Sequence, residues 1–252
     1  MDLRQLVIDE FSGENAQKFY AQKAEEGLWD SERHFIQKYF TNRRGKLLDM
    51  GCGTGRTTLP LHEKGYRVVG VDLVPAMVES ARRIARAKGK EIHYEAGDAT
   101  SLRFPDCSFD YVLFSNQGWT QIPGSAQRLA ALREMRRVLR PEGVLIFTAH
   151  PRVYARRFAL FWLQQALRFS VMKPLGFDIP EMDYGDRFFE REPSEPGSTH
   201  RTTQYIHIPS RGEVCAQIAD AGLALLEANG ELQISAQDIM THPPVFYVCC
   251  RE

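Results

Sequence analysis

Residues 46–58, Lys-Leu-Leu-Asp-Met-Gly-Cys-Gly-Thr-Gly-Arg-Thr-Thr, decide the fold of this 252-residue chain. The segment begins as a short apolar run and ends in three alternate glycines, Gly51, Gly53 and Gly55. Glycine takes positive φ without steric cost and lets a ligand approach the backbone. A buried strand that runs into such a turn and then into a helix is typical of a nucleotide-binding site. The stretch therefore predicts an α/β fold with a ligand site at this turn.

The spacing of the glycines excludes two common nucleotide motifs. The dinucleotide pattern Gly-x-Gly-x-x-Gly needs its third glycine where this chain has Arg56 or Thr58. The phosphate-loop pattern needs Gly-Lys-Ser/Thr after its first glycine, and this stretch does not contain it. Asp49 precedes the glycines, and a carboxylate there suits a cationic ligand better than a pyrophosphate. A helix N-terminus after the turn favours an anionic group such as a ligand carboxylate.

Composition narrows the class of protein. The 32 acidic and 32 basic residues give zero net charge, so a nucleic-acid partner is not expected. The sequence has no apolar run of membrane length and no signal-peptide layout at its start, so no membrane contact is expected. Five scattered cysteines favour reduced thiols and a cytoplasmic protein. No Cys/His cluster has metal-ligand spacing, so we expect no metal.

Further strands follow the glycine turn at regular intervals. The run Arg67–Val71 predicts a second strand that ends at Asp72, 21 residues after Gly51. An acid about 20 residues after the glycines, at the end of the second strand, binds ribose hydroxyls in related folds. Residues 91–96 predict a third strand that leads into Gly97-Asp98-Ala99, a fourth strand is predicted to end before Ser115, and a fifth is predicted at 144–148.

The ordered motifs resemble those of class I S-adenosylmethionine-dependent methyltransferases. They are Asp-x-Gly-x-Gly-x-Gly from Asp49, Gly-Asp-Ala at 97–99, the run Phe104–Phe114, and Val-Leu-Arg-Pro-Glu-Gly-Val-Leu-Ile at 138–146, where Glu142 replaces a usual glycine. The resemblance covers residues 45–150 and, more loosely, 200–250. It implies a Rossmann-like sheet of seven mostly parallel strands with helices on both faces and an antiparallel last strand. It also implies S-adenosylmethionine as cofactor and S-adenosylhomocysteine as product.

The resemblance assigns parts of the cofactor to the matching positions. The glycine loop would hold the methionine part, Asp72 the ribose, and Asp98 the adenine amino group, with the next amide on the adenine ring. The full set of expected cofactor-binding residues is Tyr20, Asp49, Gly51, Cys52, Gly53, Gly55, Asp72, Leu73, Met77, Asp98, Ala99, Ser115 and Gln117.

We expect a single methyltransferase domain over residues 1–252. Its four parts are a helical N-terminal cover (1–44), the cofactor-binding core (45–150), an insertion after the fifth strand that acts as a substrate lid (151–208), and the C-terminal part of the sheet (209–252). Tyr20 and Trp29 in the cover either close over the cofactor or pack in the core. The helix expected at 151–171 is rich in large apolar residues, and it either covers the substrate or joins two copies, with a monomer as the alternative.

The acceptor site is expected beyond the fourth strand and in the insertion, at Asn116, Trp119, Tyr184 and Arg187. In-line methyl transfer needs donor and acceptor held about 3 Å apart and aligned. A general base is needed only when the acceptor still carries its proton. His200 in the insertion and His150 at the end of the fifth strand are the candidate bases, because histidine titrates near neutral pH.

Three functions remain open from the sequence. The first is methyl transfer to a small molecule at an oxygen, a nitrogen or a carboxylate. The second is a tRNA methyltransferase of the wobble-uridine type, because residues 204–208 distantly resemble a segment of that group. The third is a non-catalytic module that binds S-adenosylmethionine or a partner protein.

Overall fold

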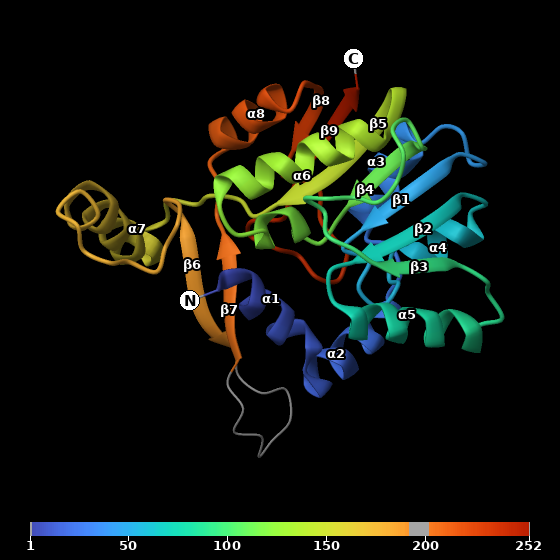
Figure 1. Ribbon diagram of the computed structural model, residues 1–252, viewed down its shortest axis with the longest axis horizontal. Helices are drawn as coiled ribbons and strands as arrows, with labels where there is room; N and C mark the ends of the chain where they lie inside the picture. Colours follow the sequence, from blue (N-terminus) through green and yellow to red (C-terminus); the bar gives the residue numbers. More distant parts are fainter. Residues whose placement is uncertain (1, 192–201, 252) are drawn as a thin grey trace.

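The computed structural model describes residues 2–191 and 202–251, and its centre is a seven-stranded sheet (Figure 1). The strand order is β3-β2-β1-β4-β5-β9-β8. β1 to β5 are parallel, whereas β9 is antiparallel to both β5 and β8. This arrangement confirms the predicted Rossmann-like fold class. The strands are β1 Lys46–Met50, β2 Arg67–Asp72, β3 His93–Ala96, β4 Phe109–Phe114, β5 Leu139–Ala149, β8 Leu223–Asn229 and β9 Val245–Arg251.

The strand order reverses between β1 and β4, and this reversal positions the site. β1 pairs with β2 on one side and with β4 on the other, so the connections that leave β1 and β4 diverge. Ligands of open α/β sheets bind in the crevice at such a switch point, beyond the carboxyl ends of the strands. The glycine turn at 51–55 follows β1 directly and therefore lies at this crevice.

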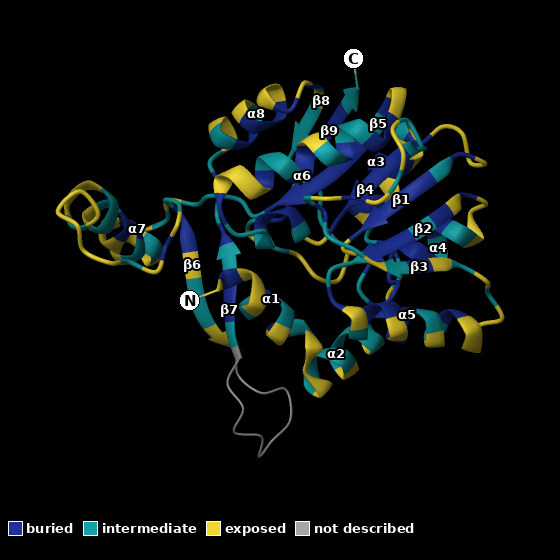
Figure 2. Cartoon of the chain, viewed as in Figure 1, coloured by how far each residue is buried: buried dark blue, intermediate teal, exposed yellow. Residues whose placement is uncertain are grey.

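Helices cover both faces of the sheet because successive residues of the buried strands point to opposite faces. Leu47 belongs to a core with α3 and α4, whereas Leu48 belongs to a core with α6 and α8. α5 packs mainly on β2 and β3. Figure 2 shows the central strands as buried between these layers. The helices are α3 Asp30–Tyr39, α4 Thr58–Glu63, α5 Pro75–Ala87, α6 Ser125–Val138 and α8 Arg211–Asp220.

Two N-terminal helices, α1 Leu3–Ser12 and α2 Glu14–Ala24, cross the open end of the sheet. Gly13 separates the two helices, and Gly27 takes a φ of 68° in the turn between α2 and α3. α1 contacts α5 and strand β7 Thr202–His207, while α2 contacts α5. The cover is therefore held by elements that are distant in the sequence.

The insertion after β5 differs in detail from the sequence-based expectation. Its helix begins later than the expected 151–171, as the 3₁₀ turn η2 Arg156–Phe158, and continues as α7 Ala159–Leu167 and the π-helical turn η3 Arg168–Met172. The strand β6 Asp186–Arg191, which the sequence reasoning did not anticipate, pairs antiparallel with β7. Figure 1 shows α7 projecting away from the main sheet, with β6 and β7 between them. Across the described residues, no helix combines the length and hydropathy needed to span a membrane.

Candidate functional site

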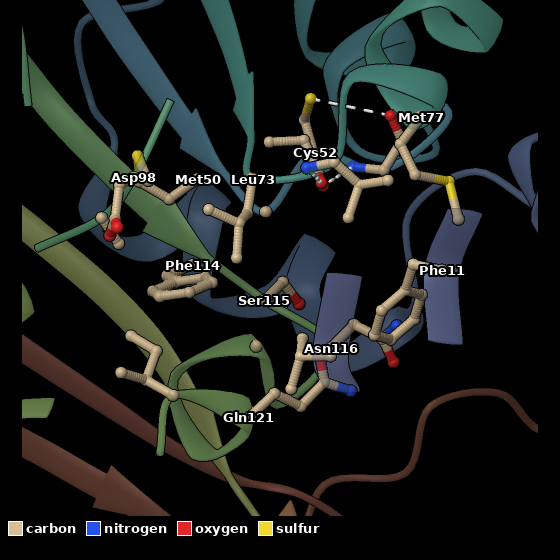
Figure 3. A pocket seen from close by; sticks show the side chains of 18 of the residues that line it. Phe11, Met50, Cys52, Leu73, Met77, Asp98, Phe114, Ser115, Asn116 and Gln121 are labelled. Carbon is tan, nitrogen blue, oxygen red and sulfur yellow. Dashed lines mark hydrogen bonds between the residues drawn. The ribbon is translucent and has the colours of Figure 1, made fainter. Parts of the chain in front are cut away.

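A cavity of about 800 Å³ lies at the carboxyl ends of β1, β2, β3 and β4. Side chains from these strand ends, from α1 and from the 3₁₀ turn η1 Gly118–Gln121 converge on it (Figure 3). Its volume is at the upper end of the roughly 300–1,000 Å³ range of ligand pockets, which leaves room for a cofactor and a small second ligand.

The glycine turn forms one wall of this cavity. Gly51 has a φ of 59°, and a Cβ there would lie 2.8 Å from the Phe114 ring. Gly51, Cys52 and Gly53 line the cavity, as expected for a turn against which a ligand packs. Gly55 does not line the cavity; its Cβ position would lie 2.9 Å from the Tyr94 hydroxyl, so this glycine permits close packing of the turn on β3.

Asp49 joins the end of β1 to the start of α4. One carboxylate oxygen accepts hydrogen bonds from the Thr57 and Thr58 hydroxyls, each 2.6 Å long. Burial raises the pKa of Asp49 to about 6, against the opposing effect of these two hydroxyls. Thr58, at a position where the dinucleotide pattern needs glycine, therefore helps to hold the Asp49 carboxylate in place. Asp49 lines the cavity, so its charge is available to a cationic ligand.

Asp72, at the end of β2, has the geometry expected of a ribose-binding residue. Its two oxygens accept from the Gly53 amide at 2.8 Å and the Val74 amide at 2.9 Å. These bonds aim the carboxylate along the cavity wall and leave lone pairs for two further donors. Burial raises the pKa of Asp72. Leu73 and Met77, the other residues expected here, also line the cavity.

Asp98, in the turn after β3, is held by the N-terminal cover. One oxygen accepts from the Thr100 amide at 2.8 Å and the Thr100 hydroxyl at 2.7 Å. The other oxygen pairs with the Arg4 guanidinium of α1 at 2.6 Å. Asp98 and Ala99 line the cavity, and their contact with adenine stays a prediction. Arg4 shares the oxygen that such a contact would use.

Sequence reasoning missed a buried ion pair between α3 and the glycine turn. Arg56 donates to the two Glu32 oxygens at 2.8 and 2.6 Å, and its guanidinium lies 4.4 Å from the Trp29 ring centre. Glu32 has no exposed surface, and it also accepts from the Ser115 hydroxyl at the end of β4. The pair therefore locks α3, the turn and β4 together. The available signal was a charged residue inside a turn of small residues, Arg56.

The chain turns sharply at the end of β4. Asn116 and Gln117 both have positive φ, 51° and 54°, a conformation that costs energy in residues other than glycine and is concentrated at functional sites. Ser115 and Asn116 line the cavity. Gln117 does not, and its backbone N–H donates to the Thr148 hydroxyl.

Trp119 does not reach the cavity, contrary to the expectation that it faces the acceptor. Its side chain is fully buried in the core and lies 5.3 Å from the Phe147 ring centre. The indole nitrogen donates to the Arg128 carbonyl at 3.1 Å. The two residues of positive φ that precede η1 redirect the chain, and so a residue only five positions beyond β4 packs under the sheet.

The remaining expected acceptor residues also lie away from the cavity. Tyr184 stacks on Trp162 within the insertion, with ring centres 5.8 Å apart. Arg187 lies on β6, 5.9 Å from the Phe161 ring centre. The insertion instead contributes Pro180 and Met182 to the cavity wall.

Of the two candidate bases, only His150 lies within the described residues; His200 lies outside them. The Nδ1 atom of His150 is 2.7 Å from the Thr120 hydroxyl, behind the turn η1. Burial lowers the pKa of His150 to about 4, which keeps the ring neutral near pH 7. His150 does not line the cavity, so as a general base it would need a proton-transfer path through η1.

A buried polar network attaches the insertion to the main domain. His207 on β7 is 2.7 Å from Asp186 through Nδ1 and 2.7 Å from Glu213 of α8 through Nε2. Arg128 of α6 pairs with Asp183 at 2.7 Å. Ligand atoms of Asp183, Asp186 and His207 lie within 4.8 Å of one another, as a cation would need. These protein partners already engage all three side chains, so we assign the cluster to attachment of the insertion.

Comparisons with known proteins agree with this geometry. Residues 47–143 match the family model described as a methyltransferase domain. A demethylmenaquinone methyltransferase of Thermus thermophilus is 40% identical over 108 residues, which are 42% of this chain and 47% of that protein. The chain therefore matches less than half of the length of this relative.

Two solved structures have the same fold over most of the chain. A methyltransferase of Methanosarcina mazei, described as dependent on S-adenosylmethionine, superposes with a TM-score of 0.69 at 22% identity, covering 89% of this chain and 98% of that one. The magnesium protoporphyrin IX methyltransferase of Synechocystis, solved with bound S-adenosylhomocysteine, has a TM-score of 0.63 at 15% identity and covers both chains fully. Residues 47–143 therefore match a methyltransferase domain, and the chain has the fold of S-adenosylmethionine-dependent methyltransferases.

Proposed function

We propose that this protein transfers a methyl group from S-adenosylmethionine to an oxygen, nitrogen or carboxylate of an apolar small molecule. The observation that carries the proposal is that one cavity joins a polar cofactor wall to an apolar wall. The polar wall holds Asp49, Asp72 and Asp98 at the ends of three neighbouring strands. The apolar wall includes Leu3, Val7, Phe11, Ile122, Pro123 and Met182.

The polar wall fits the cofactor in charge and in shape. The Asp49 carboxylate suits a ligand that carries a sulfonium and an ammonium group, and Asp72 and Asp98 offer acceptors to hydroxyl and amino groups. Gly51 leaves open the space that a Cβ would fill against Phe114. When bound, the cofactor supplies a methyl group activated by positive charge on sulfur. Asp49 would face that charge, Asp72 would accept from the ribose hydroxyls, and Asp98 from the adenine amino group.

The apolar wall is suited to an acceptor with a hydrocarbon skeleton. Leu3, Val7 and Phe11 are spaced four residues apart and therefore lie on one face of α1. Burial of an apolar ligand against this face gains about 25 cal/mol for each Å² removed from water. The side-chain amides of Asn116 and Gln121 also line the cavity, and each can both donate and accept a hydrogen bond to orient the reacting group. The chain would thus position donor and acceptor for in-line attack.

Relatives named for small-molecule acceptors support this class of acceptor. One is named for demethylmenaquinone, and one solved neighbour is named for magnesium protoporphyrin IX. Both names describe those proteins; for this chain the corresponding class of acceptor is an apolar small molecule.

Methyl-labelled S-adenosylmethionine tests the proposal. The protein is incubated with the label and a cell extract that has been divided into an organic-solvent fraction, a polar metabolite fraction and total tRNA. We expect label to enter the organic-solvent fraction, and Asp72→Ala should lose that transfer. Label found only in tRNA would support the wobble-uridine type of function, and cofactor binding without transfer to any fraction would support a non-catalytic module. Either result would refute the proposal.

A further inference from the structure

Among the residues that the structure describes, none covers one face of the helix of the insertion. Its inner face is anchored, because the Trp162 indole donates to the Val153 carbonyl at 2.7 Å and Gln165 bonds to the backbone of Gly185 and Asp186. On the opposite face the side chains are exposed: Leu160 67%, Leu163 67%, Leu167 53% and Val171 45%. Their spacing of three or four residues makes one continuous stripe.

Exposed apolar side chains are concentrated in this part of the molecule. Eight of the eleven exposed large hydrophobic residues in the described chain lie between positions 154 and 182. Leu175 and Phe177, in the loop after η3, extend the stripe and are 70% and 58% exposed. Single exposed apolar residues are ordinary, whereas a contiguous patch marks an interaction surface. We call residues 154–177 the docking unit.

The charges within residues 151–177 are all positive, and the exposed Asp178 follows directly after Phe177. Residues 151–177 contain five cationic residues and no aspartate or glutamate. Arg156 and Arg157 are exposed before the stripe, and Lys173 is exposed between Val171 and Leu175. The other two cations have acidic partners elsewhere, Arg152 with Glu213 and Arg168 with Glu181. The outer surface of the unit is therefore apolar along α7 and carries three exposed cations, with the single exposed acid Asp178 next to its end.

This charge pattern distinguishes between two possible partners of the stripe, a second copy of the chain and a phospholipid surface. A symmetric dimer brings the same patch of two copies together. Because the exposed charge around the stripe is net positive, pairing of two copies would bring like net charge together, which is unfavourable at an interface. A surface of anionic phospholipids attracts the same cations, and its acyl boundary accepts an apolar helix face.

We propose that the docking unit binds the surface of an anionic phospholipid bilayer, with α7 lying in the interface plane. Such a helix rests on the membrane without crossing it, so the absence of a spanning run in the sequence does not speak against this contact. Pro180 and Met182 follow the unit and line the cavity. Membrane contact would therefore bring the acceptor wall close to lipid, and this last point alone rests on the proposed function.

Sedimentation of the full chain with phospholipid vesicles tests the proposal. We expect binding to vesicles of equal parts phosphatidylglycerol and phosphatidylcholine, and much weaker binding to pure phosphatidylcholine. Leu163→Asp with Leu167→Asp should lower the partition coefficient by about tenfold or more, because charge is placed on the inserted face. Arg156→Glu with Arg157→Glu should lower it by about tenfold or more, and added salt should lower it further.

A matched control is available on β8, the edge strand of the main sheet. Leu225 and Leu226 on β8 are 39% and 50% exposed, and changing both to aspartate should leave vesicle binding unchanged. Each variant is first checked for an unchanged thermal midpoint and cofactor affinity, so loss of binding cannot reflect unfolding. If Leu163→Asp with Leu167→Asp melts early, Leu163→Ser with Leu167→Ser replaces it.

Several outcomes of these experiments would overturn the proposal. Failure of the wild-type chain to bind phosphatidylglycerol vesicles would do so, as would undiminished binding of the Leu163/Leu167 variant. Vesicle binding that is unaffected by both salt and the arginine changes would show that the unit does not recognise anionic lipid. A dimer in ultracentrifugation that the leucine changes dissociate, without vesicle binding, would assign the stripe to a second copy. Vesicle binding is measured without cofactor, so its outcome is distinguishable from failure of the proposed methyl transfer.

Discussion

The two walls of the cavity are built in different ways. The cofactor wall consists of turns that follow directly from parallel strands, and hydrogen bonds within those turns set Asp49 and Asp72. The acceptor wall comes from α1, η1 and the insertion, which are held in place by side-chain contacts between distant elements. Changes at one wall should therefore leave the other wall largely intact.

The largest effect is expected from Glu32→Gln, which leaves the buried Arg56 guanidinium without its partner. Breaking a buried ion pair from one side costs about 3–5 kcal/mol of unfolding free energy. Because Arg56 adjoins the glycine turn, cofactor affinity should fall as well. Urea denaturation and calorimetry measure the two effects. Glu26→Gln, which removes the exposed pair with Lys23, is the control and should cost less than about 1 kcal/mol; equal costs for both variants would contradict the role of the buried pair.

A smaller effect, confined to the acceptor wall, is expected from His207→Ala. The change leaves Asp186 and Glu213 without their shared partner, and hydrogen bonds to charged groups are worth about 1.5–3 kcal/mol. Since none of these three residues lines the cavity, cofactor affinity should stay the same. Denaturation and calorimetry again provide the two values, with the exposed His93→Ala as control. A loss of cofactor affinity in His207→Ala would show that the walls are coupled.

The pH dependence of cofactor binding should report on Asp49. Its carboxyl takes up a proton below its pKa of about 6 in the free protein, and only the ionised form attracts a cationic ligand. Affinity should therefore be constant above pH 7 and fall below pH 6 by at most about 1.4 kcal/mol per pH unit. Calorimetry between pH 5 and 8 measures it. In Asp49→Asn the affinity should be lower and flat over this range; an unchanged slope in that variant would assign the titration to another group.

The smallest effect is expected at the contact between the two walls. Arg4→Ala removes the ion pair with Asp98, in which the Arg4 side chain is 59% exposed. Exposed pairs contribute less than about 1 kcal/mol, so the unfolding free energy should change little. Because Arg4 shares the Asp98 oxygen expected to face adenine, cofactor affinity should stay equal or rise slightly. A large loss of affinity would mean that Arg4 itself contacts the cofactor.

The same contrast explains which parts of the site were predictable from the sequence. The carboxyl ends of parallel strands share one edge of the sheet, so Asp49, Asp72 and Asp98 could be placed together from strand order alone. Glu32 and Arg56 are 24 residues apart on different elements, and no local pattern pairs them. Trp119 was expected at the acceptor because it follows β4 closely, but the backbone turn at Asn116 sends it into the core.

The insertion was least predictable for a related reason. β6 is held by pairing with β7 and by the contact of Asp186 with His207, 21 residues away. Arg128 and Glu213, which complete the network, are separated by 85 residues. The preference of a segment for strand or loop is then decided by tertiary contacts instead of its own residues. The strong apolar content of 151–171 was visible, although which face of the helix stays exposed was not.

Calorimetric titration of the wild-type chain and Asp72→Ala with S-adenosylmethionine and S-adenosylhomocysteine tests the central claim most directly. We expect both ligands to bind the wild-type chain, and Asp72→Ala to weaken each by about 1.5–3 kcal/mol, because charge-assisted hydrogen bonds to the ribose are lost. Absence of binding of both ligands to the wild-type chain, or equal affinity in the variant, would contradict the assignment of this cavity to the cofactor.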